Sequence, residues 1–328
     1  MLDQRTWGFI YESFPQVSNI KRLVGEAGTR KYYRLEIDDT ETVILMDGRA
    51  QPESVQKFFE LTVMLSEREL PVAEIYAQSE DGESLLLEDL GDVAVYDALS
   101  TNSATVMPEI LDLLAKWQTK TADMQPFIAP YSRDILREEF SRADSWFFPY
   151  LLGKPLSVSE RGYFQRDCDS LVNIINNQPK VLVYRDFHSK NLMLTRDKRI
   201  VFIDYQDALW GSAAYDLISI TRDCYISYPK SIRDTWEDEF RRRNYPHLSH
   251  NAWKNICNAC ALQRHIKVLG LFVRIAKQDR KPRYLNHLPL VWDYVLEESA
   301  ALEATVPFLA SKCRELDSVV RKTLERIV

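Results

Sequence analysis

The sequence has 328 residues, of which 45% are hydrophobic and 27% are charged, and its formal net charge at pH 7 is −6. This composition is typical of a globular protein long enough for two hydrophobic cores, and it excludes the disordered and fibrous classes. The basic residues are scattered apart from the short run at 241–243, so we expect no nucleic-acid partner.

No long uninterrupted apolar stretch is present, so neither a signal peptide nor a membrane-spanning helix is predicted. The five cysteines are a sparse and odd set, which favours free thiols in a reducing compartment. Cys257 and Cys260 form a C-x-x-C pair without further zinc ligands, and we expect both in a helical core. A soluble cytoplasmic protein with no membrane partner is therefore expected, and its oligomeric state stays unknown.

The first third of the chain is rich in predicted strands. An aromatic helix-like segment at 7–14 precedes two strands within 32–46, and a helix follows at 53–70, before Pro71. Two short strands at 75–77 and 84–87 flank the Asp81-Gly82 turn signal. Together these patterns indicate a small β-rich unit ending near Gly91.

Helical patterns dominate after Gly91. They include the aromatic-rich segment 131–150 and the segment 253–276, where Leu262, Ile266, Leu269 and Val273 recur on one face. We predict an α+β protein with a β-rich N-lobe at 1–91 and a larger helical C-lobe at 92–328. One β-like island interrupts the helical half at 181–204.

This island contains two short apolar runs, Leu192–Leu194 and Ile200–Ile203, separated by the polar turn 196–199, a pattern typical of an antiparallel hairpin. If Thr195 pairs with Ile200, the register places Asn191 opposite Asp204. Directly opposed residues have Cβ atoms roughly 4.5–5.5 Å apart, close enough for two oxygen ligands to share one cation.

The residue types at this hairpin suggest phosphoryl-transfer chemistry. The Asn191 amide and the Asp204 carboxylate are hard oxygen ligands suited to Mg²⁺, whose other ligands would be water and phosphate. Asp186 precedes Asn191 by five residues and is placed to accept a proton from an attacking hydroxyl. Taken singly, each residue also fits a turn or cap role, whereas the D-x-x-x-x-N spacing with the hairpin and its terminal Asp is far more specific.

Five segments then carry a resemblance to a known family. The sequence contains YRDFHSKNLM, IDYQDALWGSAAYDL, GTRKYYRL, LLLEDLGD and RHIKVLGLFVRIAKQDRKPRYLNHLP, which together span about residues 25–289. They resemble the aminoglycoside phosphotransferase-like and choline-kinase-like branch of the protein kinase fold. Within it, they are similar to bacterial kinases that phosphorylate the anomeric hydroxyl of N-acetylmuramate and N-acetylglucosamine. The resemblance implies a two-lobed protein-kinase-like fold.

The resemblance also implies roles for particular residues. ATP would bind between the lobes, with the adenine contacted by backbone groups near Leu87, Glu88 and Leu90. A second interpretation of this segment is a charged linker between domains. A loop over the phosphates would contain Gly25, Gly28, Thr29, Arg30 and Lys31, although G-x-x-G alone is weak evidence. Asp216 would be a structural acid that braces the catalytic loop.

The chain departs from the family pattern at two positions. Tyr184 stands where the family usually has His, and Met46 lies in the strand where kinases usually carry a phosphate-binding Lys. Arg30 or Lys31 is our candidate for the missing positive charge. His188, within the catalytic loop, resembles a structural rather than a catalytic residue.

The substrate residues are the least determined. Trp146 with Arg133, Glu138 and Glu139 suits a hydroxyl-rich ring, but an amphipathic core helix explains these residues equally well. Arg264 and Tyr284 lie in the segment most particular to the sugar kinases and either frame the same pocket or support it.

We therefore expect an ATP- and Mg²⁺-dependent kinase that phosphorylates the anomeric hydroxyl of an amino sugar in cell-wall recycling. One alternative is a kinase for another small hydroxyl substrate, such as an aminoglycoside, choline or homoserine. The other is a pseudokinase that binds nucleotide without turnover, which Tyr184 and Met46 favour and which Asp186, Asn191 and Asp204 argue against.

Overall fold

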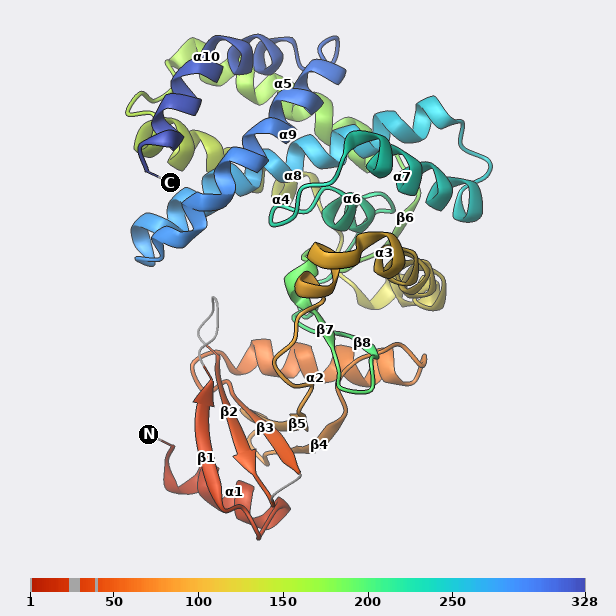
Figure 1. The fold of residues 1–328 in the computed structure, drawn as a ribbon, viewed down its shortest axis with the longest axis vertical. Coiled ribbons are helices and arrows are strands. Elements are labelled where there is room, and N and C mark those ends of the chain that lie inside the picture. The colour runs from red at the N-terminus through yellow and green to blue at the C-terminus, as the bar shows by residue number, and fades with distance from the viewer. Residues whose placement is uncertain (1, 24–29, 39–40, 328) are drawn as a thin grey trace. The chain divides into compact units, whose positions relative to one another are not determined.

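A computed structural model describes residues 2–23, 30–38 and 41–327. The chain divides into two compact units, Met1–Ala98 with Lys190–Asp207 and Leu99–Ser189 with Ala208–Val328. Figure 1 labels the elements of both units, each of which is described by itself below.

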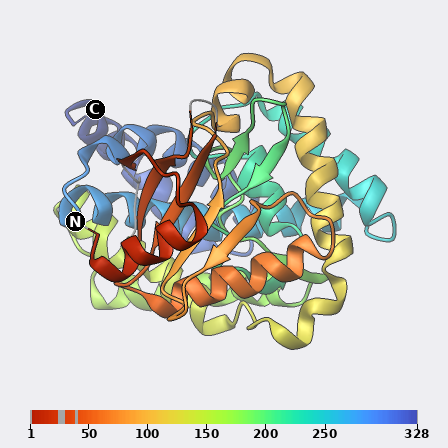
Figure 2. The ribbon, with the colours of Figure 1, turned by 90° about the horizontal axis from the view of Figure 1, so that it is seen from below.

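The first unit is built on a five-stranded antiparallel sheet with the order β1-β2-β3-β5-β4 (Figures 1 and 2). Its strands are β1 (Asn19–Leu23), β2 (Lys31–Glu36), β3 (Thr42–Asp47), β4 (Ile75–Gln78) and β5 (Ser84–Glu88). The predicted strands within 32–46 and at 75–77 and 84–87 are confirmed. We did not predict β1, because this mostly exposed edge strand contains only two apolar residues.

Two helices complete the β-rich unit, α1 (Gln4–Ser13) and α2 (Pro52–Ser66). The Asp3 side chain caps α1 by accepting the Thr6 N–H, and Ile10 of this helix is fully buried against the sheet residues Leu35 and Val43. Pro52 begins α2 at the first helical position, where a proline costs no hydrogen bond. The hairpin β7 (Leu192–Leu194) and β8 (Ile200–Phe202) also belongs to this unit.

The hairpin joins the first unit through backbone pairing. β8 forms an isolated bridge from Phe202 to Val72, and β7 forms one from Met193 to Ala94. The compact units therefore differ from the lobes predicted at 1–91 and 92–328, because residues 92–98 and 190–207 pack with the N-terminal unit. The predicted assignment of nucleotide binding to 1–91 stays a prediction.

The second unit is mostly helical (Figure 1). Its α-helices are α3 (Val95–Lys120), which begins in the first unit, α4 (Arg133–Arg142), α5 (Val158–Asn176), α6 (Tyr215–Thr221), α7 (Lys230–Asn244), α8 (His250–Gln278), α9 (Leu288–Ala301) and α10 (Pro307–Glu325). Its other helical elements are the 3₁₀-helices η1 (Ala122–Phe127) and η4 (Pro282–His287) and the π-helix η2 (Ala143–Leu151), while the 3₁₀-helix η3 (Ser189–Asn191) spans the boundary at which the first unit resumes. The strands β6 (Lys180–Val183) and β9 (Leu209–Ser212) pair antiparallel. Together with the sheet of the first unit, this confirms the predicted α+β class.

Helix α8 is the centre of the second unit. The predicted apolar face, Leu262, Ile266, Leu269 and Val273, is buried, but burial extends around the whole helix, because α4, α5, α6, α7, α9 and η2 pack against it. A Cβ on Gly270 would lie 2.2 Å from the Arg142 backbone, so only glycine permits this approach. Cys257 and Cys260 are buried in α8 as free thiols, which confirms the predicted core location.

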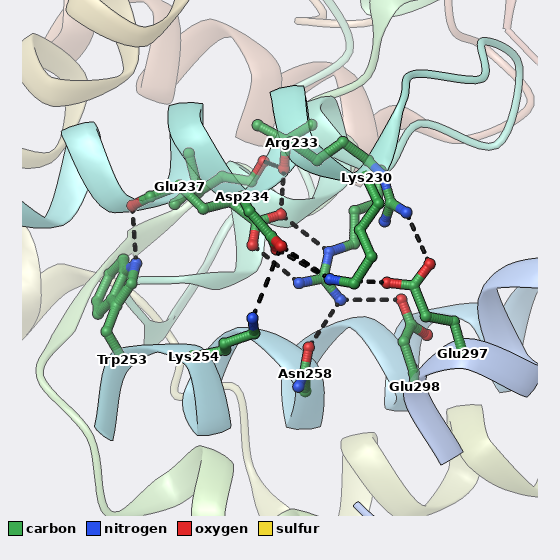
Figure 3. Close-up of polar contacts among 12 residues, drawn as sticks. Lys230, Arg233, Asp234, Glu237, Trp253, Lys254, Asn258, Glu297 and Glu298 are labelled. Atoms are coloured by element: carbon green, nitrogen blue, oxygen red, sulfur yellow. Dashed lines mark hydrogen bonds and ion pairs between the residues drawn. The ribbon is translucent and has the colours of Figure 1, made fainter. Parts of the chain in front are cut away.

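Charged side chains connect the helices around α8 (Figure 3). Arg233 of α7 pairs with Glu297 of α9 at 2.7 Å, and Trp253 of α8 donates to the Glu237 backbone oxygen. Arg222 is only 1% exposed, and its guanidinium contacts Glu237 and Glu298. A charge buried this completely needs such partners, because an unpaired ion in the interior costs several kcal/mol.

Among the described residues, no helix is both long enough and apolar enough to cross a membrane.

Candidate active site

The loop that carries Asp186 follows β6 in the second unit. Tyr184, at the position where the family usually has His, is 1% exposed and packs against Trp117, with ring centroids 5.1 Å apart. Trp117 also donates its indole N–H to the Leu182 oxygen of β6, at 2.8 Å. Tyr184 therefore lies in the aromatic core that supports the start of the loop.

Asp216, in the first turn of α6, is hydrogen-bonded to this loop. Its two carboxylate oxygens accept the backbone N–H groups of Tyr184 and Arg185, at 2.7 and 3.0 Å. Burial raises the pKa of Asp216 to about 7, while these two N–H donors favour its ionised form. This is the contact pattern expected of a structural acid.

Asp186 itself is half-buried in a positively charged environment. Burial alone would raise its pKa, but the charges of Lys267, His188 and Arg185 hold the pKa of Asp186 below its ordinary value. A carboxylate that stays ionised at neutral pH can accept a proton from an incoming hydroxyl group. The His188 ring packs edge-on against Tyr225, with ring centroids 5.2 Å apart. The backbone N–H of His188 donates to the Asp186 backbone oxygen.

A buried acid lies beside Arg185, at a position that we had grouped with Trp146 as a candidate for the sugar site. Glu139 of α4 is 0% exposed, and its carboxylate contacts the Arg185 guanidinium at 2.5 Å and the Lys267 ammonium at 3.3 Å. No sequence signal pointed to the burial of Glu139 or to its contact with Arg185. The sequence likewise contained no signal for the role of Lys267, because it lies in a segment predicted as a core helix.

In the first unit, the hairpin has a different register from the one predicted. Leu192 pairs with Phe202 and Leu194 with Ile200, one residue away from the expected ladder. The expected pairing of Thr195 with Ile200 is wrong because the turn closes earlier, with the Thr195 N–H donating to the Arg199 oxygen. Lys198 occupies the left-handed region at φ 66°, the position that closes a three-residue hairpin loop.

The register change also alters the ends of the hairpin. Ile203 faces Asn191 and donates its N–H to the Asn191 oxygen at 3.2 Å, so the predicted direct opposition of Asn191 and Asp204 is wrong. Asp204 follows with a left-handed backbone, at φ 63°, and its side chain is 47% exposed. Asn191 and Asp204 still flank the same end of one hairpin.

The donor set fits Mg²⁺. An amide oxygen and a carboxylate are hard ligands, and magnesium in proteins commonly keeps several water molecules besides one or two side chains. The Asp204 carboxylate lies on the accessible part of the hairpin end, where it accepts hydrogen bonds from Arg30 at 2.8 Å and Gln206 at 2.9 Å. We had expected Arg30 to face phosphate groups, and the structure shows it paired with the predicted metal ligand.

The predicted adenine-contacting segment lies at the end of β5. Leu87 is 5% and Leu90 is 9% exposed, and the Glu88 carboxylate pairs with Arg199 at 2.8 Å. The Glu88 N–H donates to the Glu74 oxygen. These residues therefore have local structural partners, and their contact with a nucleotide stays a prediction.

Arg34 of β2 is a further residue that we did not predict here. Its guanidinium contacts both Asp89 and Asp92, and Asp89 also accepts the Thr42 hydroxyl at 2.7 Å. A cavity of about 320 Å³ in the first unit is lined by this cluster together with Glu88, Leu90 and Gly91. Arg34 thus links β2 to the segment after β5.

Of the remaining phosphate-loop candidates, Lys31 is the one within the described residues. Lys31 is exposed at the start of β2. The predicted positions Gly25, Gly28 and Thr29 lie outside the described residues.

The predicted substrate residues fall into exposed and buried groups. Arg133 and Glu138 are exposed on α4, where Arg133 contacts Asn173 and Glu138 pairs with Arg142. Trp146 stacks on Tyr150, with ring centroids 4.9 Å apart.

The other two candidates, Arg264 and Tyr284, are buried, at 4% and 6% exposure. Arg264 donates to the Cys224 sulfur, and Tyr284 packs against Phe272. Sugar contact by any of these five residues stays a prediction.

Comparison with known proteins identifies the class. The profile of the phosphotransferase enzyme family matches residues 19–250, and the chain belongs to this family. It is therefore an enzyme of the phosphotransferase class, and the resemblance inferred from the sequence is confirmed.

Individual relatives show which phosphotransferases this chain is similar to. The N-acetylmuramate/N-acetylglucosamine kinase of Pseudomonas aeruginosa is 30% identical over 276 residues, which cover 82% of this chain and 80% of the relative. The kinase of the same name from Pseudomonas putida is 28% identical over 278 residues, covering 83% and 81%. The choline kinase LicA from Streptococcus pneumoniae matches with a TM-score of 0.62 at 11% identity, covering 89% of this chain and 99% of that one. This last likeness confirms the protein-kinase-like fold.

Proposed function

We propose that this enzyme transfers the γ-phosphoryl group of ATP to the anomeric hydroxyl of N-acetylmuramate, N-acetylglucosamine or both, giving the sugar 1-phosphate. The observation that carries the proposal is the loop of Asp186, where Asp216 accepts the backbone N–H groups of Tyr184 and Arg185. The positive charges of Lys267, His188 and Arg185 lower the pKa of Asp186, which favours its role as a base. The sugar comes from the two Pseudomonas relatives, whose names state it. The product would serve cytoplasmic recycling of cell-wall precursors.

Each residue has a defined part in this reaction. Asp186 orients the anomeric hydroxyl and accepts its proton as the oxygen attacks the γ-phosphorus in line with the leaving oxygen of ADP. Asn191 and Asp204 would hold Mg²⁺, which supplies charge neutralisation at the β- and γ-phosphates. Arg30 exchanges its Asp204 partner for phosphate oxygens when nucleotide binds, because both are anionic acceptors.

The first experiment measures ADP release with Mg²⁺ and ATP over N-acetylmuramate, N-acetylglucosamine, an aminoglycoside and choline. Asp186→Asn is run alongside, and Asp197→Asn in the exposed hairpin turn is the matched control. We expect turnover on the amino sugars that Asp186→Asn reduces by about 10²-fold or more and Asp197→Asn retains. The product should lack a free reducing end.

Other outcomes separate the alternatives. Turnover on choline or an aminoglycoside alone would keep the catalytic assignments and reject the sugar. ATP binding without turnover on any acceptor would favour the pseudokinase, in which Arg30 would permanently occupy Asp204.

A further inference from the structure

The backbone immediately before the proposed base is strained. Arg185 has φ 80°, in the left-handed region, where a side chain with a Cβ is disfavoured and glycine is not. Such a conformation persists only where surrounding contacts enforce it, and it often marks a functional position. The contacts of Arg185 are therefore informative about Asp186.

Two hydrogen-bonded contacts hold Arg185 from opposite ends, and its guanidinium also lies over the Tyr131 ring, 5.9 Å from the ring centroid. Its backbone N–H donates to Asp216 at 3.0 Å, and its guanidinium donates through Nε and Nη2 to the same Glu139 oxygen, at 3.2 and 2.5 Å. The backbone contact alone leaves the side chain free to turn. The Glu139 contact ties the side chain to α4.

Glu139 is itself held rigidly. Its second oxygen accepts the Tyr131 hydroxyl at 2.5 Å and the Gln263 amide at 3.3 Å, while Lys267 balances its charge. A fully buried carboxylate with this many donors has one orientation available. Charges from Lys267 and Arg185 hold the pKa of Glu139 at about 2 despite burial, so this acceptor stays ionised throughout the working range of an enzyme.

We propose that Glu139 is a positioning residue, which anchors the Arg185 side chain and so maintains the left-handed backbone that orients the Asp186 carboxylate. The proposal rests on the proposed function, because it takes Asp186 as the base. Glu139 does not touch the reacting atoms. It acts through Arg185.

The test compares Arg185→Ala with Arg185→Gly. Alanine removes the anchor and keeps the backbone strain, whereas glycine removes both. We expect Arg185→Ala to lower kcat about 10- to 100-fold while KM for ATP changes less than about threefold, because misorientation of the base affects the chemical step. Arg185→Gly should recover about tenfold of that loss, since glycine adopts φ 80° without an anchor.

A second comparison tests Glu139 directly. Glu139→Gln should lower kcat in the same way, and adding Arg185→Gly to it should raise kcat above that of Glu139→Gln alone. Asp134→Asn, which alters a 92% exposed acid of the same helix, is the matched control and should retain the wild-type kcat. If Glu139→Gln fails to fold, the Ala and Gly variants of Arg185 decide the proposal by themselves.

Equal kcat values for Arg185→Ala and Arg185→Gly, or a lower kcat for Arg185→Gly, would overturn the proposal that Glu139 anchors the Arg185 side chain. Thermal unfolding provides a readout that needs no substrate, and Arg185→Gly should have a higher Tm than Arg185→Ala. If the wild type turns over no acceptor, the proposed function fails. The Tm order then decides whether Glu139 and Arg185 maintain the strained turn, and a Tm no higher for glycine would reject that role.

Discussion

Arg30 and Asp204 illustrate how much of the predicted chemistry depends on single residues. The 2.8 Å ion pair between them joins a residue expected to contact phosphate with a residue expected to bind magnesium. The Asp204 side chain is 47% exposed and the Arg30 side chain 12%, so solvent screens the pair from the Asp204 side and its contribution to stability is modest. We assign the pair another role, which is to keep the Arg30 guanidinium beside the position proposed for the phosphates.

We therefore expect Arg30→Ala to raise KM for ATP about three- to tenfold and to change the free energy of unfolding by less than about 1 kcal/mol. Steady-state kinetics at varied ATP, together with denaturant unfolding, measure both quantities. Arg137→Ala, which removes an arginine from a solvent-exposed ion pair on α4, is the control. Unchanged ATP affinity and turnover in Arg30→Ala would remove the phosphate-contacting role.

Helix α8 determines the arrangement of the elements around it. Gly270 packs directly against the backbone where α4 meets η2, and a Cβ there would lie 2.2 Å from Arg142 carbon and oxygen atoms. Backbone atoms cannot move aside as a flexible side chain can. The helices would have to separate, which disrupts the packing on both sides.

Gly270→Ala should accordingly lower the free energy of unfolding by about 1–3 kcal/mol, measured by denaturant titration. Gly162→Ala in α5 is the matched control, because a Cβ at Gly162 meets nothing within 4 Å. There the same change should raise the free energy of unfolding by about 0.5–1 kcal/mol through the better helix propensity of alanine. Equal effects at the two glycines would contradict the role given to the close approach.

The second unit as a whole contains an ion-pair network that should make its stability depend on pH. His265 is 0% exposed, and its Nδ1 lies 2.8 Å from a Glu298 oxygen, while Nε2 lies 3.1 Å from the Arg222 oxygen. Burial alone would lower the pKa of His265, but the Glu298 charge, together with interactions with Cys224 and the Glu298 hydrogen bond, raises it to about 9. The protonated imidazole is thus the form that the fold stabilises.

Because the pKa is higher in the folded than in the unfolded chain, this stabilisation is fully present below about pH 6.5 and is lost as pH rises toward about 9. The stability difference between wild type and His265→Gln should shrink by about 3 kcal/mol across that window. Chemical denaturation at pH 6, 7.5 and 9 measures it. His250→Gln, at a 54% exposed histidine, serves as the control, and a difference independent of pH would contradict the assignment.

The sequence by itself determined the class of fold and located the segment that we propose to be catalytic. Alternating and helical periodicities placed β2, β3, β5 and α2 correctly, because apolar spacing directly reflects which face of an element is buried. The spacing of Asp186, Asn191 and Asp204 within one local segment was equally readable, since a motif of short range needs no knowledge of distant contacts.

Only the tertiary structure decided the hairpin register and the support of the catalytic loop. The register depended on Lys198 adopting a left-handed conformation. A glycine at this position would have predicted that conformation from the sequence, whereas a lysine does not. Glu139, Arg185 and Lys267 come from α4, the loop after β6, and α8, segments far apart in the sequence. No periodicity can reveal such a cluster, because a buried charge is acceptable only where the folded chain brings its partners to it.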